Sequence, residues 1–333
     1  MKVWVFFASL IWMVVHGLAA EKDTTEKIRF QEITDSAAWP VRHGHTAAVF
    51  KDRIWIMGGS KSERPSVIHR DVWSSADGVK WRQEVSEAPW GPRYLHQSLV
   101  FDGKLWIFGG MTSYRPRRNM NDVWWSEAGR HWSQATPDAE WPRRHVFTSL
   151  VHQNRMWLMA GAPDGTRYFN DVWSSTDGAD WQPVPSNGPR FSVRKNPASA
   201  SFQGRMWVVG GGELVVPGVM VLRDDIWTST AGRSWQLQTT DSPWPARDFP
   251  SLVVYRDRLW LLGGRDPSAP GHVTDVWVTR DGAAWKEVAS ESPWPGRHGG
   301  ALFVFQDKIW LLGGCTTGAA EDHFNDIWTL QLE

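Results

Sequence analysis

The chain has 333 residues with 36 basic and 36 acidic side chains, and this balance excludes a global field that would draw it to nucleic acid or to a membrane surface. Hydrophobic residues make up 41% of the chain, which suits a packed core and excludes general disorder. The single cysteine, Cys315, excludes an internal disulfide and a cysteine metal cluster. The 25 tryptophans are unusual, and a repeat would explain them.

The first segment, residues 1–20, is typical of a cleaved signal peptide. Lys2 supplies the positive start, residues 3–15 are apolar except for Ser9, and small residues end at Ala20. A membrane anchor is the alternative, but the apolar run is shorter than the roughly 20 residues that a span needs. We therefore expect an extracytoplasmic protein, periplasmic or secreted, with no membrane span after cleavage.

Six apolar segments with a tryptophan and a final pair of small residues recur along the chain, from IWIMGG at 54–59 to IWLLGG at 309–314. Their tryptophans are Trp55, Trp106, Trp157, Trp207, Trp260 and Trp310. The spacing is about 50 residues, longer than the repeat of about 40–45 residues that is typical of WD proteins.

Each repeat predicts four short strands. The first strands are expected at Thr46–Phe50, Gln97–Phe101, Thr148–His152, Ala198–Phe202, Ser251–Tyr255 and Ala301–Phe305. The apolar segment forms the second strand, and an Asp-Val-Trp or Asp-Ile-Trp motif begins the third. A hairpin turn with glycine then leads to a fourth strand, which begins at a tryptophan such as Trp81. The connections between second and third strands are longer and differ between repeats, as expected for loops that set specificity.

The two ends of the chain complete one repeat between them. The last repeat supplies three strands and then stops. Residues 28–33 form an isolated β-rich run, and Phe30 precedes Trp39 by the same offset that separates Trp81 from Trp90. We therefore expect this run to close the sixth sheet as its fourth strand, which removes an exposed edge.

These six units resemble the kelch-repeat β-propeller family over residues 21–333. The resemblance implies an all-β fold, a single six-bladed propeller of four-stranded antiparallel blades, closed by an N-terminal strand. Exported sialic-acid mutarotases and galactose-oxidase-type propellers are more distantly similar. The fold by itself does not predict a function, because β-propellers have many unrelated functions.

An arginine recurs before every first strand, usually in the form Trp-Pro-x-Arg. These six residues, called the arginine ring below, are Arg42, Arg93, Arg144, Arg194, Arg247 and Arg297. Kelch proteins that capture acidic ligands use arginines from this position, so the resemblance implies a ligand site here, with His45 and His96 beside it. Guanidinium groups bind carboxylate or phosphate through two parallel hydrogen bonds. The alternative is a structural pairing with the six aspartates that begin the third strands.

We therefore interpret the chain as an exported binding module whose ligand is an anionic small molecule, a glycan or an acidic protein segment. We expect it to be a monomer and not to bind nucleic acid. A sugar-acid mutarotase is the first alternative, with acid and base candidates at Glu213, Asp164, His69, His272 and His323. A structural interaction scaffold is the second. A copper radical oxidase would need a Cys–Tyr crosslink and additional domains. No cofactor is expected, and the unequal offsets of the histidines from the arginines predict no metal site.

Overall fold

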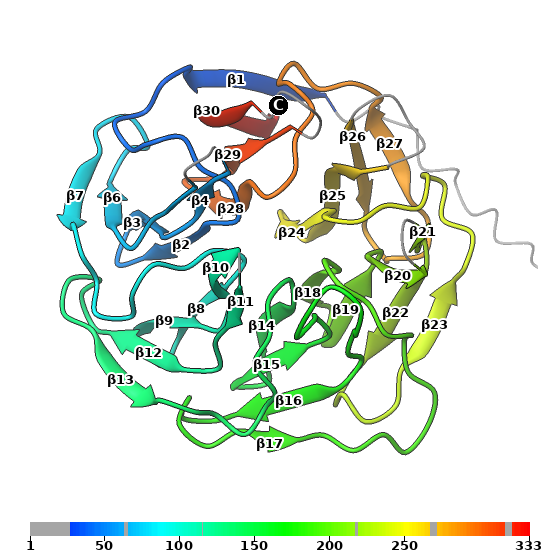
Figure 1. Cartoon of the computed structure of the whole chain (residues 1–333). Helices are drawn as coiled ribbons and strands as arrows, with labels where there is room; N and C mark the ends of the chain where they lie inside the picture. Colours follow the sequence, from blue (N-terminus) through cyan, green and yellow to red (C-terminus); the bar gives the residue numbers. More distant parts are fainter. Residues whose placement is uncertain (1–26, 63–65, 115, 217–218, 267–271, 317–321) are drawn as a thin grey trace, which may run out of the picture.

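The computed structural model describes residues 27–62, 66–114, 116–216, 219–266, 272–316 and 322–333. The predicted signal peptide lies outside these residues. Six four-stranded antiparallel sheets of the described chain surround a central axis as blades (Figure 1). No helix in this part of the chain is long and apolar enough to cross a bilayer. The predicted all-β, six-bladed fold is confirmed.

The innermost strands have the bounds that the sequence predicts. They are β2 (Thr46–Phe50), β8 (Gln97–Phe101), β14 (Thr148–His152), β18 (Ala198–Phe202), β24 (Ser251–Tyr255) and β28 (Ala301–Phe305). The second strands are β3 (Arg53–Met57), β9 (Lys104–Phe108), β15 (Arg155–Met159), β19 (Arg205–Val209), β25 (Arg258–Arg265) and β29 (Lys308–Cys315). Their apolar residues are buried between neighbouring blades, and each tryptophan indole, such as that of Trp55, donates to a carbonyl at the end of the first strand, here Phe50.

The third strands are β6 (Val72–Ser75), β12 (Val123–Ser126), β16 (Val172–Ser175), β22 (Ile226–Ser229), β26 (His272–Thr279) and β30 (His323–Leu332). The outermost strands are β7 (Arg82–Val85), β13 (Ser133–Thr136), β17 (Gln182–Pro183), β23 (Gln236–Thr239), β27 (Lys286–Ala289) and β1 (Ile28–Thr34). In blades one to five the outermost strand begins one residue after the predicted tryptophan.

The loops expected between second and third strands contain further pairing. Three of them form two-stranded hairpins, β4 (Ser60–Lys61) with β5 (Val67–Ile68), β10 (Met111–Tyr114) with β11 (Arg117–Asn119), and β20 (Gly212–Val216) with β21 (Val219–Leu222). In blades five and six the main strands extend instead, past Gly264 and Gly314. We call the face that carries these connections the top face.

Neighbouring blades interlock on the opposite face through a glycine. Gly129, in the turn between β12 and β13, has a positive φ of 72°. A Cβ atom there would lie 2.1 Å from the ring of Trp55 in the preceding blade. The turn therefore requires glycine for its backbone conformation and for the close packing of two blades.

The predicted closure is confirmed. β1 pairs with β30 in an antiparallel register that places Phe30 opposite Leu330, and the first and last strands lie side by side in Figure 1. The Phe30 ring meets Trp294 edge to face at 5.2 Å, as Trp81 meets Trp39 at 6.1 Å. Phe30 thus takes the place of the tryptophan that directly precedes the outermost strand in the other blades.

Replacing Phe30 by alanine is expected to lower the free energy of unfolding by about 2 kcal/mol, because the half-buried ring helps to hold the closing strand. Urea denaturation followed by tryptophan fluorescence measures this change. Leu237→Ala is the control, since Leu237 lies exposed on β23 and its loss should change stability by less than about 0.5 kcal/mol. Equal stability of the two variants would contradict the role of Phe30.

Candidate functional site

The arginine ring is buried inside the blades. Five of its members are fully buried and Arg297 is 6% exposed. Each guanidinium makes a bidentate ion pair with the aspartate of the Asp-Val-Trp or Asp-Ile-Trp motif in the same blade. The pairs are Arg42–Asp71, Arg93–Asp122, Arg144–Asp171, Arg194–Asp225, Arg247–Asp275 and Arg297–Asp326. In the first five pairs the Nη–Oδ distances are 2.6–3.0 Å.

Other donors of these guanidinium groups also have internal partners, although Nε of Arg93 is buried without a hydrogen-bond partner. In blade one, Arg42 donates from Nε to the carbonyl of Pro40 and from Nη1 to the carbonyl of Gly58. The same pattern explains why proline, arginine and the glycine pair recur together. In blade two an extra glycine precedes the proline, and there Arg93 Nη2 donates to the carbonyl of Trp90 instead.

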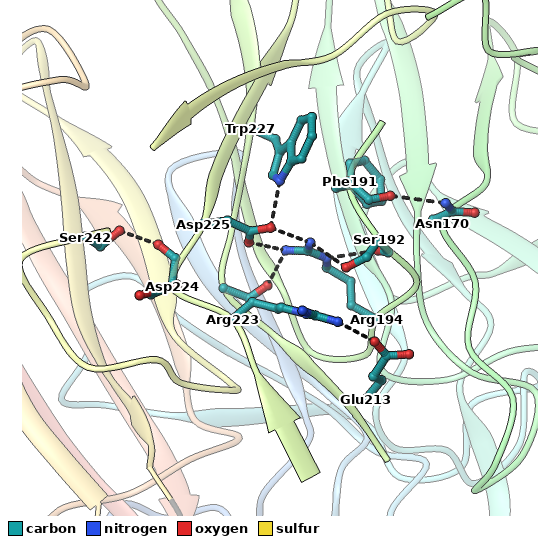
Figure 2. Close-up of polar contacts among 11 residues, drawn as sticks. Asn170, Phe191, Ser192, Arg194, Glu213, Arg223, Asp224, Asp225, Trp227 and Ser242 are labelled. Carbon is teal, nitrogen blue, oxygen red and sulfur yellow. Dashed lines mark hydrogen bonds and ion pairs between the residues drawn. The ribbon is translucent and has the colours of Figure 1, made fainter. Parts of the chain in front are cut away.

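The aspartate is shared with the tryptophan of the Asp-Val-Trp motif. Figure 2 shows blade four, where Asp225 accepts from Arg194 and from the indole N–H of Trp227, the latter at 2.7 Å. The motif is therefore a buried network that ties the first, second and third strands together. This geometry is that of the structural alternative, so we do not carry the arginine ring into the proposed ligand site.

His45 and His96 are also buried, with 5% and 1% of their surface exposed. They line a central cavity of about 290 Å³ together with residues at or just before the start of all six innermost strands. Burial holds the pKa of both rings well below the usual value, and Arg42 and Arg93 lower the pKa of His45 and His96 respectively. His96 Nε2 lies 3.0 Å from the Thr46 hydroxyl. At neutral pH both rings are therefore neutral parts of the cavity wall.

The residue after each ring arginine forms a second set, which we call the post-arginine residues. They are His43, Tyr94, His145, Lys195, Asp248 and His298. Each pairs through its backbone with the residue that begins the top-face connection of its own blade, for example His43 with Ser60. Lys195 and Asp248 were not among the predicted site residues, although their fixed offset from the arginines was a usable signal.

The next residue in each blade turns the chain at the axis. These residues are Gly44, Leu95, Val146, Asn196, Phe249 and Gly299, and all have φ between 52° and 65°. Backbone N–H groups of five of them donate to the carbonyl of the preceding member, as Leu95 does to Gly44 at 2.7 Å. Backbone hydrogen bonds thus join neighbouring blades at five of the six positions around the axis, and a ligand that separated them would leave backbone groups without partners.

Positive charge collects on the top face around blades three and four. Lys195 is partly buried, and Arg117 of β11 lies against Gly165 of blade three. Burial lowers the pKa of Lys195, Asp248 opposes this effect, and Arg265 and Arg117 add to it. Burial and then Arg117 lower the pKa of His145, to about 4. No ion pair joins Lys195 or Arg117 to a carboxylate among the described residues.

The nearby acidic groups are already paired. Asp248 is fully buried and holds Arg265 in a bidentate pair at 2.7 and 2.9 Å. Glu213 of β20 pairs with Arg223, as Figure 2 also shows. The two basic groups, Lys195 and Arg117, therefore lack an ion-pair partner within the described chain.

The acid and base candidates of the mutarotase alternative do not converge. Glu213 is held by Arg223, and Asp164 accepts hydrogen bonds from Thr166 and Arg167 in its own turn. Burial lowers the pKa of His69 to about 4, and Arg42 adds to the effect. His272 of blade five and His323 of blade six instead belong to a group of histidines that extends along the top face to His43 of blade one.

Comparison with known proteins agrees with this architecture. The family model described as the KLHDC2/KLHL20/DRC7 Kelch-repeats domain matches residues 44–236, more than half of the chain. The chain belongs to the kelch-repeat family. The kelch propeller also resembles the solved structure of YjhT, with a TM-score of 0.67 over 87% of this chain and 95% of that one, and 16% sequence identity. At that identity the likeness shows the fold alone.

Curated relatives of this kelch propeller are larger proteins. It is 26% identical over 249 residues to the Leucine-zipper-like transcriptional regulator 1 homolog of Drosophila melanogaster, which covers 67% of this chain and 24% of that protein. It is 28% identical over 169 residues to the Dynein alpha chain, flagellar outer arm, of Chlamydomonas reinhardtii, covering 45% of this chain and 4% of the relative. The chain thus spans about a quarter or less of the length of these relatives.

Proposed function

We propose that this kelch propeller is an exported binding module that takes an anionic ligand, a sugar acid or sulfated glycan or an acidic peptide, on its top face. The observation that carries the proposal is the pair of cations, Lys195 and Arg117, without an ion-pair partner in the described chain. An ammonium and a guanidinium near each other repel, and a carboxylate or sulfate between them removes that repulsion while accepting charged hydrogen bonds.

The partly buried position of Lys195 supports a specific site over a general one. A lysine that loses water on folding gains more from an anion than an exposed lysine does, because the local dielectric constant is lower. His145 lies beside both cations and adds a neutral imidazole that can donate one hydrogen bond. The predicted signal peptide supports a location outside the cytoplasm. Mass spectrometry of the protein from its host would test this, because cleavage of the signal peptide lowers the mass.

Lys195→Ala is expected to weaken binding of the ligand about tenfold, the loss of one charge-assisted hydrogen bond. A thermal-shift screen against sialic acid, uronic acids and sulfated glycans first identifies the ligand, and calorimetry then compares the variants. Higher salt should weaken the wild-type complex.

Lys80→Ala is the matched control, because Lys80 is an exposed lysine in the turn between β6 and β7. It should bind as the unmodified protein does. Equal affinity of the Lys195 variant, or no shift with any anion, would overturn the proposal. A sugar ligand whose anomer ratio changes faster with protein than without would identify a mutarotase instead of a binding module.

A further inference from the structure

Three potential metal ligands meet on the top face where blade six joins blade one. They are His43, Cys315 and His323, and one ligand atom from each lies within 4.8 Å of the other two. Cys315 ends β29, His323 begins β30, and His43 precedes β2 at the other end of the chain. Closure of the propeller therefore creates this cluster.

Two distances in and beside the cluster are close to those of a tetrahedral site. With Zn–N of about 2.0–2.1 Å and Zn–S of about 2.3 Å, tetrahedral ligands lie roughly 3.3 Å apart for two nitrogens and about 3.6 Å for nitrogen and sulfur. His43 Nδ1 lies 3.1 Å from His323 Nε2. Cys315 Sγ lies 3.8 Å from Nε2 of His298, a further post-arginine residue.

The fold encloses the cluster. His43 is 8% exposed and Cys315 is 2% exposed. His323 Nδ1 is buried and has no hydrogen-bond partner in the described structure.

An outer partner also orients one of these rings. His298 Nδ1 lies 2.9 Å from Nε2 of His272, and the two rings are stacked with an interplanar angle of 7°. Histidine ligands commonly use their second nitrogen in such a contact, which fixes the tautomer and the ring orientation. His272 therefore fits the position of a supporting residue, outside the ligand set.

We propose that His43, His323 and Cys315 bind one zinc ion, and that His298, which lies beside Cys315 but outside the group of three, moves in as the fourth ligand when the ion binds. Three imidazoles and a thiolate, without a carboxylate, match the donor preference of zinc and disfavour magnesium or calcium. Binding replaces the thiol proton, which is released to solvent. The ion would join the two ends of the propeller, and the inference does not depend on the anion site, which lies across the axis at blades three and four.

Cobalt(II) reports on the site because a cobalt–thiolate bond gives a charge-transfer band that imidazole ligands alone do not give. We expect the purified protein, kept reduced, to bind one equivalent of cobalt with this band and to exchange it for zinc. Competition with a chromophoric chelator then gives the zinc affinity. Zinc should also raise the melting temperature, increasingly with its free concentration.

Two ligand variants and one control decide the proposal. Cys315→Ser should abolish the thiolate band, and His323→Ala, at a partly exposed position, should weaken zinc binding at least tenfold. His145→Ala is the control, since His145 is also a post-arginine residue but lies outside the cluster. Circular dichroism checks the folding of each variant, and the His323 variant decides alone if the Cys315 variant does not fold.

The proposal is overturned by any of three results. These are less than stoichiometric binding of cobalt and zinc, bound cobalt without a thiolate band, or unchanged zinc affinity in the His323 variant. Lys195→Ala should keep full zinc binding, so failure of the metal site and failure of the anion site are separate outcomes.

Discussion

Asp122→Ala is expected to lower the free energy of unfolding by about 3–5 kcal/mol, the usual cost of breaking a buried ion pair from one side. The substitution removes a bidentate partner, at 2.9 and 3.0 Å, from Arg93, whose side chain is fully buried. It also removes the acceptor of the Trp124 indole N–H, at 2.7 Å. The guanidinium charge is then left in the blade without compensation. Urea denaturation measures the loss.

A surface ion pair provides the comparison. Arg143–Asp138 has a similar N–O distance, 3.2 Å, but its side chains are 56% and 68% exposed, so Asp138→Ala should cost at most about 1 kcal/mol. The double variant with Arg93→Met and Asp122→Leu should recover part of the loss, because it removes the unpaired charge and restores apolar volume. If Asp122→Ala costs no more than Asp138→Ala, the structural role of the arginine ring is wrong.

Stability is expected to fall by several kcal/mol as the pH is lowered from about 6.5 to about 4. Burial lowers the pKa of His145 from 6.5 to about 4, and it also holds the pKa of His45 and His96 well below 6.5. Above pH 6.5 these rings are neutral in both states. Below it the unfolded chain binds protons that the native protein does not, which favours unfolding. Each unit of pKa is worth about 1.4 kcal/mol, and the neighbouring rings are coupled, so their effects do not simply add.

Urea titrations at pH 7, 6 and 5 measure this dependence. His145→Gln should reduce its slope, because the glutamine binds no proton in either state. His131→Gln is the control, since His131 is exposed, and it should leave the slope unchanged. Equal stability at pH 7 and pH 5 would show that the histidines are not held in the neutral form by the fold.

The fold could be predicted because its signals are local and repeated. The first strands, such as Thr46–Phe50, lie between the segment that contains the ring arginine and a short turn. Their bounds could therefore be predicted from the residues that flank them. Phe30 could be aligned with Trp81 by its offset alone, and β1 lies where that offset predicts. The loops were harder, because pairing within β10 and β11 or β20 and β21 follows no repeated pattern.

The candidate site could be predicted less well. The positions of the arginines were clear, but not the direction of their side chains. Residues such as Leu95 have a left-handed backbone conformation, which turns the chain at the central axis. The side chain of Arg93, two residues earlier, is thereby left inside the blade, where it pairs with Asp122. Sequence spacing does not report that direction, so a ligand and an internal aspartate were equally compatible with it.

By itself the sequence determined a closed six-bladed propeller, because each blade repeats the same tryptophans, glycines and aspartates at fixed offsets, and one blade cannot bury its faces alone. Only the tertiary structure decided which polar groups have partners and which do not. Lys195 and Arg117 come from different blades, and His43 lies beside His323, 280 residues away, because the closure of the ring brings the chain ends together. Such contacts depend on three-dimensional closure, which no local offset encodes.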